Sequence, residues 1–177
     1  SSYSKDNPAI TCASDPKIDN FLRFNSCDVI HDQYEYTRMD KAKSVIEHSR
    51  KTNIFPQLRV CWITNGGGNC CKCEKCYRTI YEIIACGGDP NKYGLEFNRS
   101  LNQKAKIFFM YKYEMPIILK PLWKEIRNEF ITNKNNIKNS DDYKWITKLN
   151  FEKENNIFIR KCVKLLSKVK AKVHGRR

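Results

Sequence analysis

The chain has 177 residues, which is enough for one domain of ordinary size or for the second half of a larger one. Its net charge of +14 and isoelectric point of about 9.4 favour anionic partners such as nucleic acid, acidic membrane surfaces or phosphorylated ligands. Its apolar runs are far shorter than the roughly 18 residues that a membrane-spanning helix needs, so the sequence predicts no transmembrane segment.

The first half of the chain is expected to contain two helices separated by extended segments. Residues 39–49 carry apolar residues at helical spacing, with Thr37 or Asp40 as the N-terminal cap. Residues 74–86 show the same spacing, and the glycines that begin at Gly87 end the helix. Apolar runs predict strands at 9–13 and 58–63, and residues 18–24 are expected to form a short helix or turn. Residues 27–31 are another short apolar run.

The second half is expected to be helical and basic. Residues 89–98 form a polar turn region, so we divide the chain there into a domain at 1–90 and an extension at 91–177. Residues 160–177 hold eight lysines and arginines and no acidic residue, so a helix there could present a basic face to an anionic partner. Helices are expected at 101–113, 122–131 and 156–172, with a loop at 132–142 and a short helix around Trp145.

Residues 61–79 contain five of the nine cysteines of the chain, and most of the residues that could carry chemistry lie in this stretch. Thiolates two residues apart can face one small ion, and a longer loop can bring in a further one, which completes the closed tetrahedral shell of structural zinc. The sequence therefore predicts a metal site, with Zn²⁺ as the favoured ion. The ligands, in the spacing C-x8-C-x2-C-x2-C, are Cys61, Cys70, Cys73 and Cys76.

Other interpretations of these cysteines differ in strength. Disulfides are disfavoured, because the number of cysteines is odd, two are adjacent and nothing resembles a signal peptide. An iron–sulfur cluster stays open, because C-x2-C-x2-C also occurs in bacterial ferredoxins, although Ile80 and Tyr81 stand where their fourth Cys-Pro follows. A site without metal is a further alternative. Cys71 is expected to be a bystander that could substitute for Cys70.

The cysteine stretch resembles the zinc segment of a known family. LRVCW at 58–62, NC at 69–70 and CEKCYRT at 73–79 are similar to the C-terminal zinc segment of proteins related to 7-cyano-7-deazaguanine synthase, in the PP-loop or adenine nucleotide α-hydrolase-like group. Uncharacterised members with LRVCW…NCGRCEKCLRT are more similar, and they have glycine where this chain has Cys71. VIHD at 29–32, Glu35 and TRMDK at 37–41 resemble the stretch that precedes that loop. The resemblance covers roughly residues 10–90.

The resemblance implies an α/β, helix-rich fold. This would be the C-terminal part of a PP-loop (HUP-like) fold, with a four-cysteine zinc knuckle at 61–76 and a helical C-terminal extension. It implies a structural zinc in an ATP pyrophosphatase-related enzyme. The SGGxDS signature that holds ATP phosphates does not occur in this sequence, and the three glycines from Gly66 lack its context. We therefore expect a fragment that is inactive alone, with ATP and the small-molecule or nucleotide substrate bound through a missing N-terminal half.

Catalytic roles are open at this stage. His31 could be a general base or a substrate ligand, or a structural histidine hydrogen-bonded at the end of a strand. Lys41 could bind substrate, or it could be a solvated lysine on a helix face. The candidates, which share the family-like segment before the metal loop, are His31, Asp32, Glu35, Arg38 and Lys41.

Two functions from different classes follow from these patterns. The first is the zinc-containing C-terminal part of a cytoplasmic PP-loop-related enzyme. The alternative is a non-catalytic, basic zinc module that binds RNA or another anionic partner, with lysines on phosphates and exposed aromatic rings stacked on bases.

Overall fold

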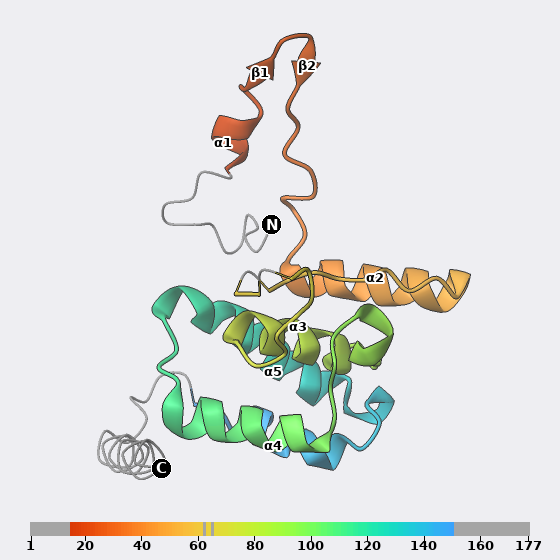
Figure 1. Ribbon diagram of the computed structural model, residues 1–177, viewed down its shortest axis with the longest axis vertical. Helices are drawn as coiled ribbons and strands as arrows, with labels where there is room; N and C mark the ends of the chain where they lie inside the picture. Colours follow the sequence, from red (N-terminus) through yellow and green to blue (C-terminus); the bar gives the residue numbers. More distant parts are fainter. Residues whose placement is uncertain (1–14, 62, 65, 151–177) are drawn as a thin grey trace. The chain divides into compact units, whose positions relative to one another are not determined.

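The structure is a computed structural model that describes residues 15–61, 63–64 and 66–150 (Figure 1). It divides into two compact units, Ser1–Ile54 and Phe55–Arg177, which we describe separately. The division differs from the boundary expected after residue 90, because helices on either side of that residue pack against each other. The strand expected at 9–13 and the helix expected at 156–172 lie outside the described residues.

Unit 1 contains a short helix, a small hairpin and one long helix. The elements are α1 (Pro16–Asp19), β1 (Arg23–Phe24), β2 (Cys27–Asp28) and α2 (Arg38–Thr52). β1 and β2 pair antiparallel, with Arg23 opposite Asp28, and these two side chains form an ion pair of 3.0 Å. The base of the hairpin is closed by His31, whose Nδ1 lies 2.7 Å from Oδ2 of Asp19.

Helix α2 begins where the sequence predicted. Thr37 is the N-cap, and its side chain accepts a hydrogen bond from the backbone N–H of Asp40. The Asp40 carboxylate accepts in return from the backbone N–H of Thr37, which completes a capping box. The helix ends at Asn53 in the left-handed conformation, which is a common way to end a helix.

Unit 2 is a bundle of short helices around one central helix, α3 (Glu74–Ala85). Every residue of α3 from Cys76 to Ala85 is buried, whereas the sequence predicted only one apolar side. A helix buried on all sides belongs to the core. The other elements are η1 (Pro90–Tyr93), α4 (Arg99–Ile107), η2 (Phe108–Lys112), η3 (Ile117–Leu119), α5 (Lys120–Thr132), η4 (Lys134–Asn136), η5 (Ser140–Tyr143) and α6 (Lys144–Thr147).

Two boundaries in unit 2 have clear local causes. Helix α3 ends at Ala85, and Gly87 directly after the C-cap Cys86 has a left-handed φ of 73° and an N–H that bonds back to the carbonyl of Ile84. The helix predicted at 101–113 is two elements, because after α4 the chain widens into the π-helical turn η2. The N–H of Tyr113 there bonds to the carbonyl of Phe108, five residues back, at 2.8 Å.

The core of unit 2 is aromatic and is organised around Tyr81. The Tyr81 ring is fully buried and lies 5.5 Å from the ring of Trp145 and 6.1 Å from that of Trp123, centroid to centroid. Its hydroxyl donates to Oδ1 of Asn102 at 2.9 Å, and the indole of Trp145 donates to the same oxygen at 3.3 Å. The Asn102 amide nitrogen donates to the carbonyl of Asp142 at 3.0 Å. One buried amide therefore satisfies polar groups from three segments.

The helix-rich character of the fold is confirmed, and among the described residues the sheet is limited to the hairpin β1–β2. The strand predicted at 58–63 is wrong, since residues 58–61 have no regular secondary structure. A strand needs a neighbouring strand for its hydrogen bonds, and this segment instead meets the backbone of η1 at one point, where the N–H of Leu58 bonds to the carbonyl of Tyr93. None of the described helices combines the length and apolar character needed to cross a bilayer.

We predict that Asn102→Ala lowers the free energy of unfolding by about 2–4 kcal/mol, because it leaves the buried donors of Tyr81 and Trp145 without an acceptor. Urea unfolding followed by tryptophan fluorescence measures the loss. Gln103→Ala, at the exposed neighbouring position of α4, should change stability by less than about 0.5 kcal/mol. Equal effects of the two substitutions would contradict the role of Asn102.

Candidate metal centre

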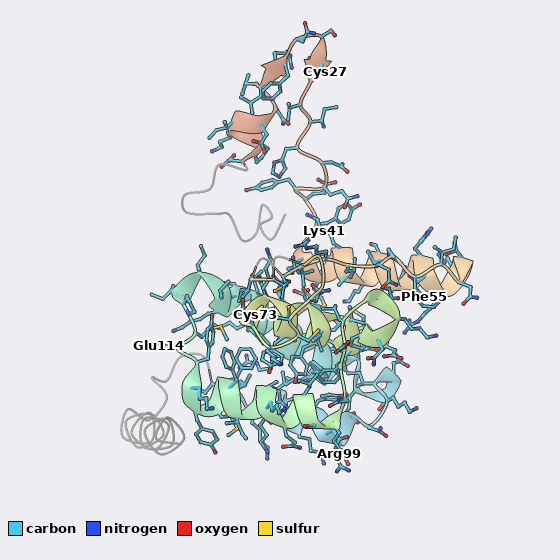
Figure 2. The ribbon with its side chains drawn as sticks, viewed as in Figure 1. Cys27, Lys41, Phe55, Cys73, Arg99 and Glu114 are labelled. Atoms are coloured by element: carbon cyan, nitrogen blue, oxygen red, sulfur yellow. The ribbon has the colours of Figure 1, made fainter. Side chains whose placement is uncertain are left out.

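Four cysteine sulfurs come together at the N-terminal end of α3. Cys61 ends an irregular segment, Cys70 lies in the following loop, Cys73 is the N-cap of α3, and Cys76 lies in its first turn. Figure 2 labels Cys73 at this end of the helix. The four Sγ atoms lie within 4.8 Å of one another, and Cys61 and Cys76 are buried. These are the four ligands that the spacing predicted, and this group could hold a metal ion.

The separation of the sulfurs suits a single ion. Tetrahedral zinc holds each thiolate sulfur at about 2.3 Å, which places the sulfurs about 3.8 Å apart. The Sγ atoms of Cys70 and Cys76 are 3.8 Å apart. This pair has the spacing of two sulfurs on one tetrahedral ion, and no two of the four sulfurs are more than 4.8 Å apart.

Backbone N–H groups already point at the sulfurs. The N–H of Cys70, followed by those of Ile63 and Thr64, bonds to the Cys61 sulfur and lowers the pKa of that thiol to about 5. Burial raises the pKa values of Cys73 and Cys76, against the effect of one backbone N–H on each sulfur. Burial thus opposes the thiolate forms of Cys73 and Cys76, and a bound cation would offset that cost.

Asn69 builds the loop that carries Cys61 and Cys70, and the sequence analysis missed it. Its side-chain oxygen accepts from the backbone N–H groups of Val60 and Cys61 at 2.9 and 3.1 Å. Its side-chain nitrogen donates to the carbonyls of Leu58 and Gly94 at 2.7 and 2.9 Å. One amide thus replaces a neighbouring strand. An asparagine directly before a ligand cysteine was the available signal, because this side chain offers both donors and an acceptor.

Glycine and arginine complete this loop. Gly94, which accepts from Asn69, has a φ of 76°, and a Cβ there would lie 2.8 Å from the side-chain oxygen of Gln57. The turn therefore favours glycine both by conformation and by space. Arg59 donates to the carbonyl of Thr64 at 3.1 Å, and the Thr64 hydroxyl donates to the carbonyl of Gly68. These two hydrogen bonds hold the loop that contains the three glycines from Gly66, which the sequence analysis placed in the metal loop.

Cys71 lies outside the four-sulfur group. Its sulfur is buried and donates to the carbonyl of Asn69 at 3.6 Å. Its φ of 52° is left-handed, a conformation that glycine adopts at the least cost. The bystander role predicted for Cys71 matches this geometry.

A buried ion pair lies on α3 beside the cluster. Nε of Arg78 is 3.2 Å from Oε1 of Glu74, and the same oxygen accepts from the indole N–H of Trp123 at 2.9 Å. The phenol of Tyr113 is in the same neighbourhood. Burial, followed by the negative charge of Glu74, raises the pKa of Tyr113 to about 12, while Arg78 acts in the opposite direction. The start of α3 is therefore linked to α5 and to the end of η2.

The catalytic candidates lie in unit 1. The His31 side chain is 5 % exposed and engages Asp19, and its ring meets that of Tyr34 edge-on at 5.4 Å. These contacts match the hydrogen-bonded structural histidine that was one of the two interpretations of His31. The others are placed as follows: Asp32 and Glu35 are exposed, and Arg38 and Lys41 lie in the first turn of α2. A catalytic role for any of them stays a prediction.

A scan against protein-family models finds no matching family, and searches of curated proteins and of solved structures find no match either.

We predict that Cys71→Gly keeps the full metal content and unfolds at the same temperature or higher, because it relieves a left-handed residue that is not a ligand. Cys70→Ser, one position away, should lose most of the metal, since an alcohol replaces a thiolate. Metal analysis and thermal unfolding of both variants measure this. Metal retained in Cys70→Ser and lost in Cys71→Gly would reverse the ligand assignment.

Proposed function

We propose that the four cysteines bind one Zn²⁺ and that this zinc is structural. The observation that carries the proposal is the convergence of four sulfurs within 4.8 Å. Four protein ligands close the shell and leave no open position for water or substrate, which is the arrangement of structural zinc sites. The ion would cross-link the segment that ends at Cys61, the loop of Cys70 and helix α3.

Zinc fits the donors better than the alternatives. Thiolate is a soft ligand that zinc and iron–sulfur clusters both accept. The neighbouring sulfurs 3.8 Å apart match one ion in a tetrahedron, whereas a cluster must hold several iron atoms between its cysteines. Zinc in a shell of four thiolates leaves two negative charges, and Arg59, Lys72 and Lys75 lie close along the chain to offset them.

We further propose that this is the zinc-containing C-terminal part of a PP-loop-related ATP pyrophosphatase. The support is the sequence LRVCW…NCCKCEKCYRT together with the residues matched at 29–41. On this proposal, ATP binds to an N-terminal half, and unit 1 contributes to the substrate site through His31, Arg38 or Lys41. This proposal predicts that the parent reading frame encodes SGGxDS upstream. It also predicts that the longer protein releases pyrophosphate. A parent protein without that signature would contradict it.

The zinc proposal predicts one zinc per chain and a colourless protein when the chain is purified without added metal. Cys73→Ser should lose the zinc and the helical structure of unit 2 together, because metal binding and folding are coupled. Cys27→Ser is the matched control, since Cys27 is an exposed cysteine of unit 1. Elemental analysis and circular dichroism measure both effects. A folded, metal-free Cys73→Ser protein would contradict a structural metal, and a brown protein with iron and sulfide would contradict zinc.

One observation favours the second candidate function, an anionic-partner module. A cavity of about 570 Å³ lies between the end of α3 and the start of α4, and Arg99, Lys138 and the rings of Phe97 and Tyr143 line it. Cations and aromatic rings together suit single-stranded nucleic acid. Asp89 and Asp142 also line the cavity and reduce its positive charge, so this function ranks second.

The second candidate predicts salt-sensitive binding of single-stranded RNA that Arg99→Glu weakens. Lys148→Glu is the control, because it makes the same change of charge at an exposed position away from the lining of that cavity. Fluorescence anisotropy at several salt concentrations measures the affinity. Equal losses in the two variants would indicate attraction by net charge alone and would contradict a site at the cavity.

A further inference from the structure

Arg78 is a buried arginine whose hydrogen bonds are incomplete. Its side chain is 5 % exposed, and its Nε lies 3.2 Å from the Glu74 carboxylate. The ion pair is close but not aligned, because neither Nε nor Nη1 of Arg78 has a hydrogen-bond partner among the described residues, and both atoms are buried. The guanidinium therefore keeps two donor atoms that reach no acceptor in the described part of the chain.

The Glu74 carboxylate is also bound by a second residue of the core. Its Oε1 accepts from the indole N–H of Trp123 at 2.9 Å, and Trp123 is fully buried. The carboxylate is thus fixed by the core of unit 2. It balances the charge of Arg78 through space, and Nε and Nη1 keep no hydrogen-bond partner among the described residues. A buried donor without an acceptor has lost its hydrogen bonds to water without replacement, so proteins seldom keep one without a use.

The neighbourhood of Arg78 contains further features that are frequent at binding sites. The π-helical turn η2 ends immediately before Tyr113, and such turns occur often at functional sites. The phenol of Tyr113 lies close enough to Glu74, Arg78 and Cys73 to respond to their charges. Its ring is stacked on Phe108 at 4.8 Å between centroids, which keeps the phenol in place. A guanidinium and a phenol therefore lie together beside the metal cluster.

We propose that Arg78 binds an oxyanion, a carboxylate or phosphate group of a small ligand, next to the metal centre. A planar guanidinium offers paired N–H groups that match two oxygens of such a group, and charge-assisted bonds of this kind are about twice as strong as neutral ones. Glu74 acts as the positioning residue that holds the guanidinium through the ion pair. This inference rests on the unpaired atoms of Arg78 and is independent of the PP-loop proposal.

Nitrogen-15 NMR of the arginine Nε–H groups in the full, metal-loaded chain tests this site. Inorganic phosphate and acetate are titrated separately, which distinguishes the two sources of the oxyanion. The Nε–H signal of Arg78 should shift and saturate with one of them. The Nε–H signal of Arg50, an exposed arginine of α2 that belongs to neither candidate site, should shift only weakly and without saturation. Equal, non-saturating responses of the two arginines, or no response of Arg78 to either ion, would overturn the proposal.

Two variants separate binding from folding. Arg78→Lys keeps the charge but loses the paired donors, so the affinity for the anion should fall about tenfold or more. Glu74→Gln keeps an oxygen for Trp123 and removes the competing negative charge, so it should bind the anion several-fold more tightly. Should Arg78→Lys fail to fold, Glu74→Gln still decides the matter, because unchanged or weaker binding in that variant contradicts an anion held by Arg78.

Discussion

Four cysteine sulfurs meet at the N-terminal end of α3, and on the proposal of a bound zinc the neutralisation of their thiolates is the constraint on which unit 2 depends. Burial raises the pKa values of Cys73 and Cys76, so the protein alone does not favour the charged cluster. Backbone N–H groups favour the thiolate of Cys61. On the proposal of a bound zinc, the cation would supply the rest of the stabilisation and would cross-link the segment of Cys61, the loop of Cys70 and helix α3.

Helix α3 connects the cysteine cluster to the rest of unit 2. Its first turn holds two of the ligands, and its middle places Tyr81 at the centre of the aromatic core. Between them, Glu74 and Arg78 connect the helix to Trp123 of α5 and to Tyr113 after η2. The metal centre, the buried ion pair and the core therefore lie on one element, and a change at the cysteines is expected to reach all three.

Local signals in the sequence predicted part of this arrangement. The cap at Thr37 and the glycines after α3 act through their immediate neighbours, and the two-residue spacing of cysteines does the same. Interactions across the chain were not predictable. Asn69 replaces a strand with a side chain, so residues 58–61 read as a strand but do not form one. The burial of Arg78 depends on packing around α3, and no periodic pattern indicates it.

X-ray absorption at the metal edge of the purified chain is the most direct measurement of the central claim. The account predicts zinc with four sulfur scatterers at about 2.3 Å and no oxygen or nitrogen in the first shell. Fewer than four sulfurs, or a second metal atom nearby, would contradict a single closed four-cysteine site and would move the functional question to open-site or cluster chemistry.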